Sequence, residues 1–348
     1  MNFGSDNMGP VHPMVMAALA RANEGYATPY GNDALMGTVR EQLRDVFEAP
    51  DAEVFLVATG TAANSLALAT LVDPWQAIYC SRLAHIHMDE CGAPEFYSGG
   101  AKLVLVPETD AKIAALDLNA AITEGLDRGL HYVQPGAVSL TQVTERGTIY
   151  SLAELEELAA VAQAHNLSVH MDGARFANAL VALGCSAADM TWKAGIRAVS
   201  FGGTKNGLMG VEAVVLLEPK FADAFEFRRK RAAQLWSKHR YLSAQMAAYL
   251  SDGLWLDMAR RANQAASRLA DGLAGLGYAR LHHPIEANMI FVSLPRGAHR
   301  RAIEAGANYF LTLDDLAGGS DDDLVPARLV TNWATTDDEI DRFLATLR

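Results

Sequence analysis

Short segments typical of β-strands alternate with helical segments between about residue 50 and residue 220, and this alternation is the strongest constraint on the fold. Strands are expected at 54–58, 77–80, 102–106, 137–142, 168–171, 198–201 and 210–217, and helices at 62–71, 118–126, 151–164 and 174–183. Ser151 and Glu154 form a capping-box sequence at the start of one helix. Strand–helix alternation of this kind predicts an α/β fold with a mainly parallel sheet and helices on both faces.

The pattern changes after about residue 220, where helical segments become long and strands become few. Helices are expected at 220–231, 243–276, 298–305 and 337–347, with a break near 251–253, and strands at 288–294 and 329–332. This arrangement predicts a smaller α+β unit. With 348 residues, half of them apolar, the chain is long enough for two domains. We predict a large domain over 1–248 and a small C-terminal domain over 249–348.

Charge and composition exclude several classes of function. The net charge of −12 argues against nucleic acid and anionic membrane surfaces as partners, since both require basic patches. No stretch approaches the roughly 20 apolar residues that cross a bilayer, and we expect no signal peptide. Cys80, Cys91 and Cys185 are too scattered for a disulfide framework or a metal site. These features predict a cytoplasmic protein with reduced thiols and no metal.

Most of the chemically versatile side chains fall directly after expected strands. In an open parallel sheet, ligands bind at the carboxyl ends of the strands. Five segments fall there: 59–64, 81–87, 142–144, 172–175 and 202–205. The functional residues are therefore expected at one edge of the larger sheet.

Lys205 and Asp172 follow two of these strands. Lys205 lies in the sequence Gly-Gly-Thr-Lys-Asn-Gly, where burial would lower its pKa and where glycine lets a planar ligand approach. Asp172 follows the apolar segment 168–171 and suits a buried cation such as a pyridinium nitrogen. Taken singly, each residue also fits a structural role, Lys205 as a surface residue in a turn and Asp172 as a helix N-cap.

Three further segments complete a candidate site. Gly60 and Thr61 join a strand to a helix, and the free N–H groups at a helix N-terminus attract phosphate. His85 follows another strand and would stack on a planar ring or transfer a proton. Arg328 has the planar guanidinium that binds carboxylates. Each residue also has an ordinary structural alternative, and only their order along the chain favours a single site.

These motifs resemble those of the low-specificity L-threonine aldolases, which are fold-type-I enzymes that use pyridoxal 5'-phosphate (PLP), in the group that also holds the β-eliminating lyases. The resemblance covers nearly the whole chain, from the segment 4–7 to the segment 328–331. Its most specific parts are Thr59-Gly60-Thr61 with Asn64, Ala84-His85, Asp172-Gly173-Ala174-Arg175 and Thr204-Lys205. The resemblance implies the fold-type-I architecture and the cleavage of L-threonine and L-allo-threonine to glycine and acetaldehyde.

The resemblance also implies how the matched residues hold the cofactor. Lys205 would be joined covalently to PLP, Asp172 would pair with the pyridine nitrogen, and His85 would stack on the ring. Three residues would bind the phosphate: Gly60, Thr61 and Thr204.

Substrate binding and subunit contacts are implied in the same way. Ser5, Arg175 and Arg328 would hold the substrate carboxylate, with Arg175 also near the ring hydroxyl. Members of the family are commonly homotetramers whose sites are shared across a dimer interface. The segment 237–240, which ends at Arg240, resembles a stretch that reaches the phosphate of a neighbouring subunit. Tyr30 and Gly31 would lie near the shared edge, with Tyr30 close to the substrate. A homotetramer that binds a small β-hydroxy amino acid is therefore expected.

One position departs from the family pattern. Many members carry a histidine after the strand expected at 137–142, in a segment like Glu-Asn-Thr-His, where this chain has Thr144. The base that removes the hydroxyl proton is then either His85 or a water held near Thr144. The same fold and cofactor would also suit an aldolase for phenylserine or β-hydroxyaspartate, a β-eliminating lyase or a racemase. A non-catalytic phosphate-binding protein is the more distant alternative.

Overall fold

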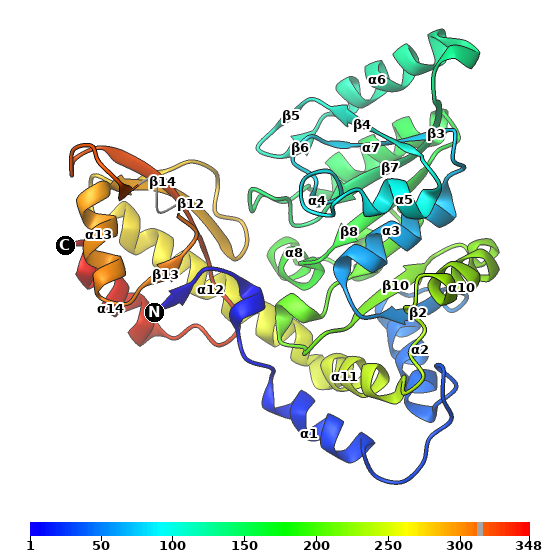
Figure 1. The fold of residues 1–348 in the computed structure, drawn as a ribbon, viewed down its shortest axis with the longest axis horizontal. Coiled ribbons are helices and arrows are strands. Elements are labelled where there is room, and N and C mark those ends of the chain that lie inside the picture. The colour runs from blue at the N-terminus through cyan, green and yellow to red at the C-terminus, as the bar shows by residue number, and fades with distance from the viewer. Residues whose placement is uncertain (312–315) are drawn as a thin grey trace.

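The largest sheet of the protein, seen in a computed structural model that describes residues 1–311 and 316–348, has seven strands. Their order is β2-β10-β9-β8-β7-β3-β4. The strands are β2 (Glu53–Val57), β3 (Gln76–Ser81), β4 (Lys102–Val106), β7 (Gln134–Thr141), β8 (Ser168–Gly173), β9 (Ala198–Phe201) and β10 (Glu212–Leu216). β10 pairs antiparallel with β2 and β9, and the other pairs are parallel. The predicted mainly parallel sheet is confirmed (Figure 1).

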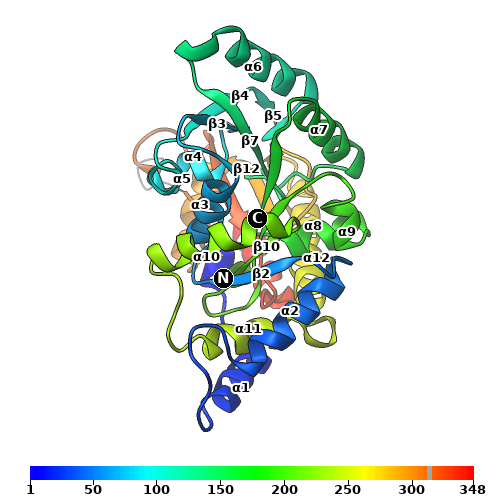
Figure 2. The ribbon, with the colours of Figure 1, turned by 90° about the vertical axis from the view of Figure 1, so that its right-hand side faces the viewer.

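Side chains of these strands point alternately to the two faces of the sheet. In β2, Val54 and Leu56 belong to the main core, whereas Phe55 and Val57 belong to a cluster on the other face. This is the two-residue period of a strand that is buried on both sides. The main-core face is covered by α2 (Ala34–Val46), α6 (Ala115–Asp127), α7 (Leu152–Ala164) and α8 (Phe176–Leu183), and the other face by α3 (Gly60–Leu71), α5 (Ala93–Ser98) and α10 (Ala222–Arg231) (Figure 2).

Hydrogen bonds from side chains to the backbone set where two of the crossover helices begin. The predicted capping box is present at α7, where the Ser151 hydroxyl accepts from the Glu154 N–H and the Glu154 carboxylate accepts from the Ser151 N–H. The helix expected at 174–183 begins instead at Phe176. The reason is that the N–H of Ala174 donates to Oδ1 of Asp172 at 3.0 Å, which holds residues 173–175 outside the helix.

The C-terminal part of the chain forms the predicted smaller α+β unit. Its antiparallel sheet has the order β11-β12-β14, with β11 (Arg280–Leu281), β12 (Met289–Pro295) and β14 (Leu324–Val330). The helices beside it are α13 (Arg296–Glu304), α14 (Asp337–Leu347) and the second half of α12 (Leu254–Ala274). β14 begins earlier than the strand expected at 329–332, and Pro326 fits there because β14 lies at the edge of the sheet. Arg328 therefore lies within the strand rather than directly before it.

The predicted break in the long helical segment is confirmed. α11 (Arg240–Leu250) is followed by the single turn η5 (Ser251–Gly253), and α12 begins directly afterwards. Asp252 has a φ of 55°, which interrupts the helix. The packing changes within α12, since Trp255 belongs to the main core and Leu269 to the small-domain core. The division expected at residue 248 falls in α11, before this change.

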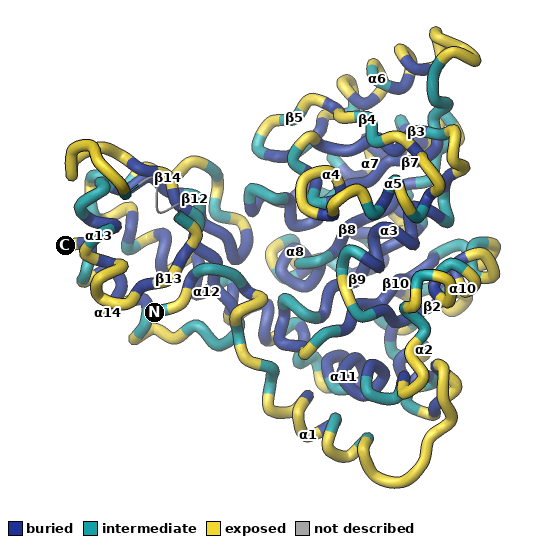
Figure 3. The backbone as a smooth tube through the Cα atoms, in the orientation of Figure 1, coloured by how far each residue is buried: buried dark blue, intermediate teal, exposed yellow. Residues whose placement is uncertain are grey.

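The first residues of the chain pack on the small domain. β1 (Asn2–Phe3) pairs with β13 (Asn308–Tyr309), and Phe3 is part of the small-domain core. Two helices that the sequence analysis did not predict follow, α1 (Pro13–Ala22) and α2, and both pack on α11. α1 and the segment after it are largely exposed (Figure 3). Every helix in the described part of the chain is too short or too polar to cross a bilayer.

Gly202, directly after β9, has no room for a side chain. A Cβ atom there would lie 2.3 Å from the carbonyl oxygen of Ala174 and 2.7 Å from that of Gly173. We expect Gly202→Ala to lower the free energy of unfolding by about 3 kcal/mol, the upper range for overpacking, in urea denaturation. Gly37→Ala, in open space within α2, is the matched control and should stabilise the protein by about 0.5–1 kcal/mol. Equal stability of Gly202→Ala and the wild type would contradict this packing.

Candidate active site

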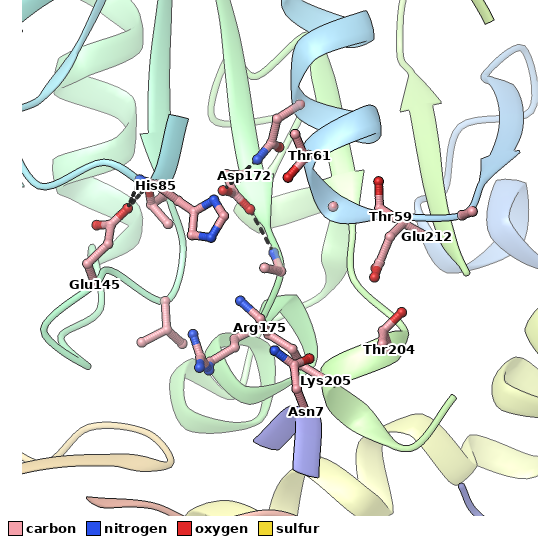
Figure 4. Close-up of a pocket in the computed structure, with 16 residues that line it drawn as sticks. Asn7, Thr59, Thr61, His85, Glu145, Asp172, Arg175, Thr204, Lys205 and Glu212 are labelled. Carbon is pink, nitrogen blue, oxygen red and sulfur yellow. Dashed lines mark hydrogen bonds between the residues drawn. The ribbon is translucent and has the colours of Figure 1, made fainter. Parts of the chain in front are cut away.

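A cavity of about 280 Å³ lies at the carboxyl ends of the central strands (Figure 4). All five segments predicted to carry the chemistry contribute to it. Its lining residues are Asn7, Ala58, Thr59, Gly60, Thr61, Asn64, His85, Thr141, Val143, Glu145, Asp172, Ala174, Arg175, Thr204, Lys205 and Glu212. The parallel strand order therefore brings together side chains that are far apart in the sequence.

Lys205 reaches the cavity from η3 (Thr204–Asn206), a single turn that follows β9. Burial lowers the pKa of its amine, and the positive charge of Arg175 lowers it further, while nearby carboxylates act in the opposite direction. A lowered pKa increases the fraction of free amine, which is the form that attacks an aldehyde. The position thus suits a covalent link to a carbonyl compound.

Asp172 lies near the end of β8, on the strand next to the one that leads to Lys205. Its side chain is buried, and two donors fix it: Oδ1 accepts from the N–H of Ala174 at 3.0 Å, and Oδ2 accepts from Nδ2 of Asn64 at 2.9 Å (Figure 4). A buried carboxylate held in one orientation at a cavity is suited to pair with a cationic group of a ligand.

The N-terminus of α3 forms another side of the cavity. Thr59 caps this helix, because its hydroxyl accepts from the N–H of Ala62 at 3.1 Å. The remaining N–H groups of a first turn have no partner within the helix. Gly60 and Thr61 line the cavity, and a Cβ atom on Gly60 would meet nothing within 4 Å. The helix end therefore offers donors and open space to an anion such as phosphate.

Glu212, which the sequence analysis did not single out, is buried beside Thr204. Its Oε2 accepts from the N–H of Gly203 at 2.6 Å. Burial raises the pKa of Glu212 to about 7, although the Thr204 hydroxyl, which donates to this carboxyl, acts to lower it. The same hydroxyl accepts from the N–H of Val211 at 3.3 Å. Glu212 therefore fixes the turn that carries Lys205, and the single hydroxyl hydrogen of Thr204 already has an acceptor.

His85 begins the short helix α4 (His85–Met88) after β3 and is held at two points. Its backbone N–H donates to Oε1 of Glu145 at 2.8 Å, and its ring Nδ1 lies 2.9 Å from Oε1 of Glu90. The hydrogen bond with Glu90 raises the pKa of His85, against the effect of burial. The imidazole is therefore both oriented and basic.

Glu145 is a second buried acid that the sequence analysis missed as a site residue. Its Oε1 also accepts from the Thr141 hydroxyl at 2.8 Å, and its Oε2 has no hydrogen-bond partner in residues 1–311 and 316–348. Burial raises the pKa of Glu145 to about 7. Its position in the sequence, directly after the segment 142–144, was the only signal, because an acid in a loop is usually solvated.

Thr144 is buried in a turn and is not among the residues that line the cavity. Its hydroxyl lies 2.7 Å from the hydroxyl of Thr148 and accepts from the N–H of the same residue at 3.2 Å. Val143 and Glu145, on either side of it, line the cavity instead. The hydroxyl of Thr144 is thus engaged in holding its own turn.

Arg175 is bound by a buried acid from the N-terminal segment. Its Nε and Nη2 donate to the two carboxylate oxygens of Asp6 at 2.7 and 3.0 Å. Burial alone would raise the pKa of Asp6, but the Arg175 charge holds it below its usual value. Ser5 caps η1 (Asp6–Met8) by accepting from the N–H of Asn7 at 3.2 Å. Asn7 lines the cavity, whereas Ser5 does not.

Arg328 lies on β14 and lines a second cavity of about 510 Å³. Its guanidinium carbon is 5.0 Å from the centre of the Phe310 ring, and its Nη2 is 3.5 Å from the carbonyl oxygen of Gly4. Its buried Nε has no hydrogen-bond partner in the described residues. Burial and then the charge of Arg175 lower the pKa of Arg328.

Tyr30 and Arg240 lie outside the cavity of this chain. The side chain of Tyr30 is exposed, and its N–H donates to the carbonyl oxygen of Ser237 at 3.1 Å. Arg240 donates from Nη1 to the carbonyl oxygen of Gly25 at 3.0 Å. Both residues lie beside the exposed segment that follows α1. In residues 1–311 and 316–348 there is no cluster of side chains that would hold a metal ion.

Known proteins of similar sequence match this chain over almost its whole length. The Beta-eliminating lyase family matches residues 2–295. A low specificity L-threonine aldolase of Pseudomonas sp. (strain NCIMB 10558) is 38% identical over 346 residues, which cover 99% of this chain and 96% of that protein. A low specificity L-threonine aldolase of Pseudomonas aeruginosa is 40% identical over 333 residues, which cover 96% of this chain and 93% of that protein.

Solved structures extend this likeness to the fold. The threonine aldolase of Leishmania major has a TM-score of 0.91 and 29% identity, and the match covers 99% of this chain and 98% of that one. A serine palmitoyltransferase of Sphingomonas wittichii has a TM-score of 0.71 at 17% identity and covers 100% of this chain and 86% of that one. At that identity the second likeness concerns the fold alone.

The raised pKa of Glu145 predicts a pH dependence of stability. Its pKa of about 7 in the folded protein lies above the ordinary value of 4.5, so its favourable contribution is complete at low pH and is lost as the pH rises through about 7. Between about pH 5 and pH 8, the free energy of unfolding should fall by up to about 3 kcal/mol more in the wild type than in Glu145→Gln. Urea denaturation across this range measures the difference. A difference that does not change with pH would contradict the assignment.

Proposed function

This chain belongs to the Beta-eliminating lyase family, and from that premise we propose that its Lys205 cavity uses PLP to cleave threonine and allo-threonine to glycine and acetaldehyde. The reaction type makes the protein a carbon–carbon lyase of the aldolase class, in line with the low specificity L-threonine aldolases that match almost its whole length. One observation carries the proposal: the Lys205 amine, the Asp172 carboxylate and the N-terminus of α3 share one cavity.

PLP fits this cavity through the chemistry of its three groups. Its aldehyde needs an amine, which Lys205 supplies with a lowered pKa. Its pyridine nitrogen needs an acid partner, which the buried carboxylate of Asp172 supplies. Its phosphate needs N–H donors and space, which the helix start at Gly60 and Thr61 supplies. Bound there, PLP acts as an electron sink for the pair released when the Cα–Cβ bond breaks.

The large-domain residues hold the cofactor in a fixed position. Nζ of Lys205 would hold the cofactor through its aldehyde group, since the lowered pKa makes the free amine available. Asp172 would pair with the pyridine nitrogen, and Asn64 holds its carboxylate in place for that role. Thr204 supports the phosphate end mainly through its turn, because its hydroxyl hydrogen is donated to Glu212.

Arg328 is assigned to the substrate carboxylate. Its Nε lacks a partner, whereas Arg175 already forms a two-bond ion pair with Asp6. Arg175 remains in the cavity as a second positive group near the ring hydroxyl, and Ser5 contributes by capping η1. Fixing the carboxylate orients the Cα–Cβ bond for cleavage. Holding the reacting bond in the right orientation lowers the activation free energy of the reaction.

His85 is assigned as the base that takes the proton of the substrate hydroxyl. Its ring lines the cavity and is held by Glu90. A water held by Thr144 is the alternative, but the hydroxyl of Thr144 is engaged with Thr148 and does not line the cavity. Thr144 therefore does not take over the role of the histidine that many family members carry at this position.

The assembly and location are part of the same proposal. We expect a homotetramer in which Tyr30 and Arg240 approach the site of a neighbouring subunit, since both lie near an exposed segment and away from the cavity of their own chain. A cytoplasmic location is proposed because Cys80, Cys91 and Cys185 are all unpaired.

Product analysis tests the reaction. The PLP-loaded protein should convert L-threonine and L-allo-threonine to equal amounts of glycine and acetaldehyde, with D-threonine left unchanged. Phenylserine and β-hydroxyaspartate in the same assay identify a preference for larger aldehydes. Formation of 2-oxobutanoate and ammonia would indicate elimination. Formation of D-allo-threonine from L-threonine, or of D-threonine from L-allo-threonine, would indicate racemisation at Cα. Either result without glycine would overturn the proposed reaction.

A further inference from the structure

Glu90 is a buried acid that contacts the ring of His85 but does not itself line the cavity. It lies between α4 and α5, and none of its side chain is exposed. Its Oε1 accepts two hydrogen bonds, from Nδ1 of His85 and from Nδ2 of Asn64, each at 2.9 Å. Its Oε2 has no hydrogen-bond partner in the described part of the chain. Burying a carboxyl in this way is costly, so a purely structural role would be better served by an apolar residue.

Asn64 connects Glu90 to Asp172. The same amide nitrogen of Asn64 also donates to Oδ2 of Asp172 at 2.9 Å. An amide nitrogen has two hydrogens, so one is donated to each carboxylate. The opposite orientation of the amide would place its oxygen against two acids. A continuous path of hydrogen bonds therefore runs from His85 through Glu90 and Asn64 to Asp172, across the segment after β3, helix α3 and strand β8.

The bond to Glu90 determines which nitrogen of His85 is basic. Burial raises the pKa of Glu90, whereas the hydrogen bonds from His85 and Asn64 act to lower it. The ionised carboxylate only accepts hydrogen bonds, so with Glu90 ionised Nδ1 carries the hydrogen. In the neutral ring, Nε2 then has the free lone pair, and it is the nitrogen that can receive a proton. The backbone N–H of His85 is held separately, by Glu145.

Charged groups from four segments act on His85. Glu90 and Asp172 favour the protonated ring, while Lys205 and burial oppose it. Glu145 binds the backbone N–H, not the ring. Glu90 is the acid that touches the imidazole directly, so its charge is the strongest single control over the basicity of His85.

We propose that Glu90 is a positioning residue, which holds His85 with a proton on Nδ1 so that Nε2 receives the hydroxyl proton of the substrate. This inference rests on the proposed function for the identity of that proton. In this arrangement His85 is the base and Glu90 is the acid that orients it. Asn64 connects Glu90 by hydrogen bonds to Asp172, the acid assigned to the pyridine nitrogen.

Nitrogen chemical shifts of labelled histidine test the arrangement in the PLP-loaded enzyme, with His85→Ala used to assign the signal. In the wild type, neutral His85 should carry its hydrogen on Nδ1. Glu90→Gln keeps an oxygen that can accept from both donors but removes the charge. We expect it to lower the pKa of His85, to move the acid limb of kcat/KM to lower pH by the same amount, and to reduce kcat about tenfold, part of the 10²–10⁴ that acid–base catalysis supplies.

Glu145→Gln is the matched control, because it removes a buried carboxylate that binds the backbone of His85 rather than its ring. The Nδ1 tautomer should persist in this variant. A wild-type His85 with its hydrogen on Nε2 would overturn the inference even if Glu90→Gln did not fold. So would threonine cleavage by Glu90→Gln with an unchanged pH profile. A tautomer and pKa that respond to Glu90→Gln, in a protein that does not cleave threonine, would support the pairing and overturn the proposed function instead.

Discussion

The site depends on the removal of an amine and several carboxyl groups from water at one edge of a parallel sheet. Buried charges are costly unless specific partners compensate them, and here each partner also sets an orientation. Arg175 holds Asp6, and Asn64 holds Asp172. Lys205 lies among these groups with a lowered pKa, so its amine is available for chemistry rather than locked in an ion pair. Burial therefore has two effects here: it makes the charged groups costly in free energy, and it lowers the pKa of the Lys205 amine.

These contacts also join the two domains. Asp6 belongs to the N-terminal segment, whose first strand packs on the small domain, and it binds Arg175 of the large domain. Asn288, directly before β12, donates to the same carboxylate at 3.1 Å. Lys205 and Asp172 belong to the large domain, and Arg328 belongs to the small domain. A shift between the domains would change the separation of these groups, and the buried Asp6 contacts oppose such a shift.

The sequence was sufficient to predict the sheet, most of its helices and the five segments at its carboxyl edge, because strand periodicity and chain order determine them. It was not sufficient for Glu90, Glu145 and Glu212, since nothing local distinguishes an acid buried by tertiary packing from a solvated one. Thr144 is the opposite case. The resemblance to the family indicated a functional residue at its position, but in the fold its hydroxyl is engaged within its own turn. The exposed N-terminal helix α1 was missed because its packing surface is provided by α11, far along the chain.

The proposed function requires that Lys205 is the residue covalently joined to PLP. Borohydride reduction of the PLP-loaded protein, followed by peptide mass analysis, locates that bond directly. We expect one modified peptide, which contains Lys205, and no visible absorption band from bound cofactor in Lys205→Ala. A modified lysine elsewhere, or a normal absorption band in Lys205→Ala, would contradict it.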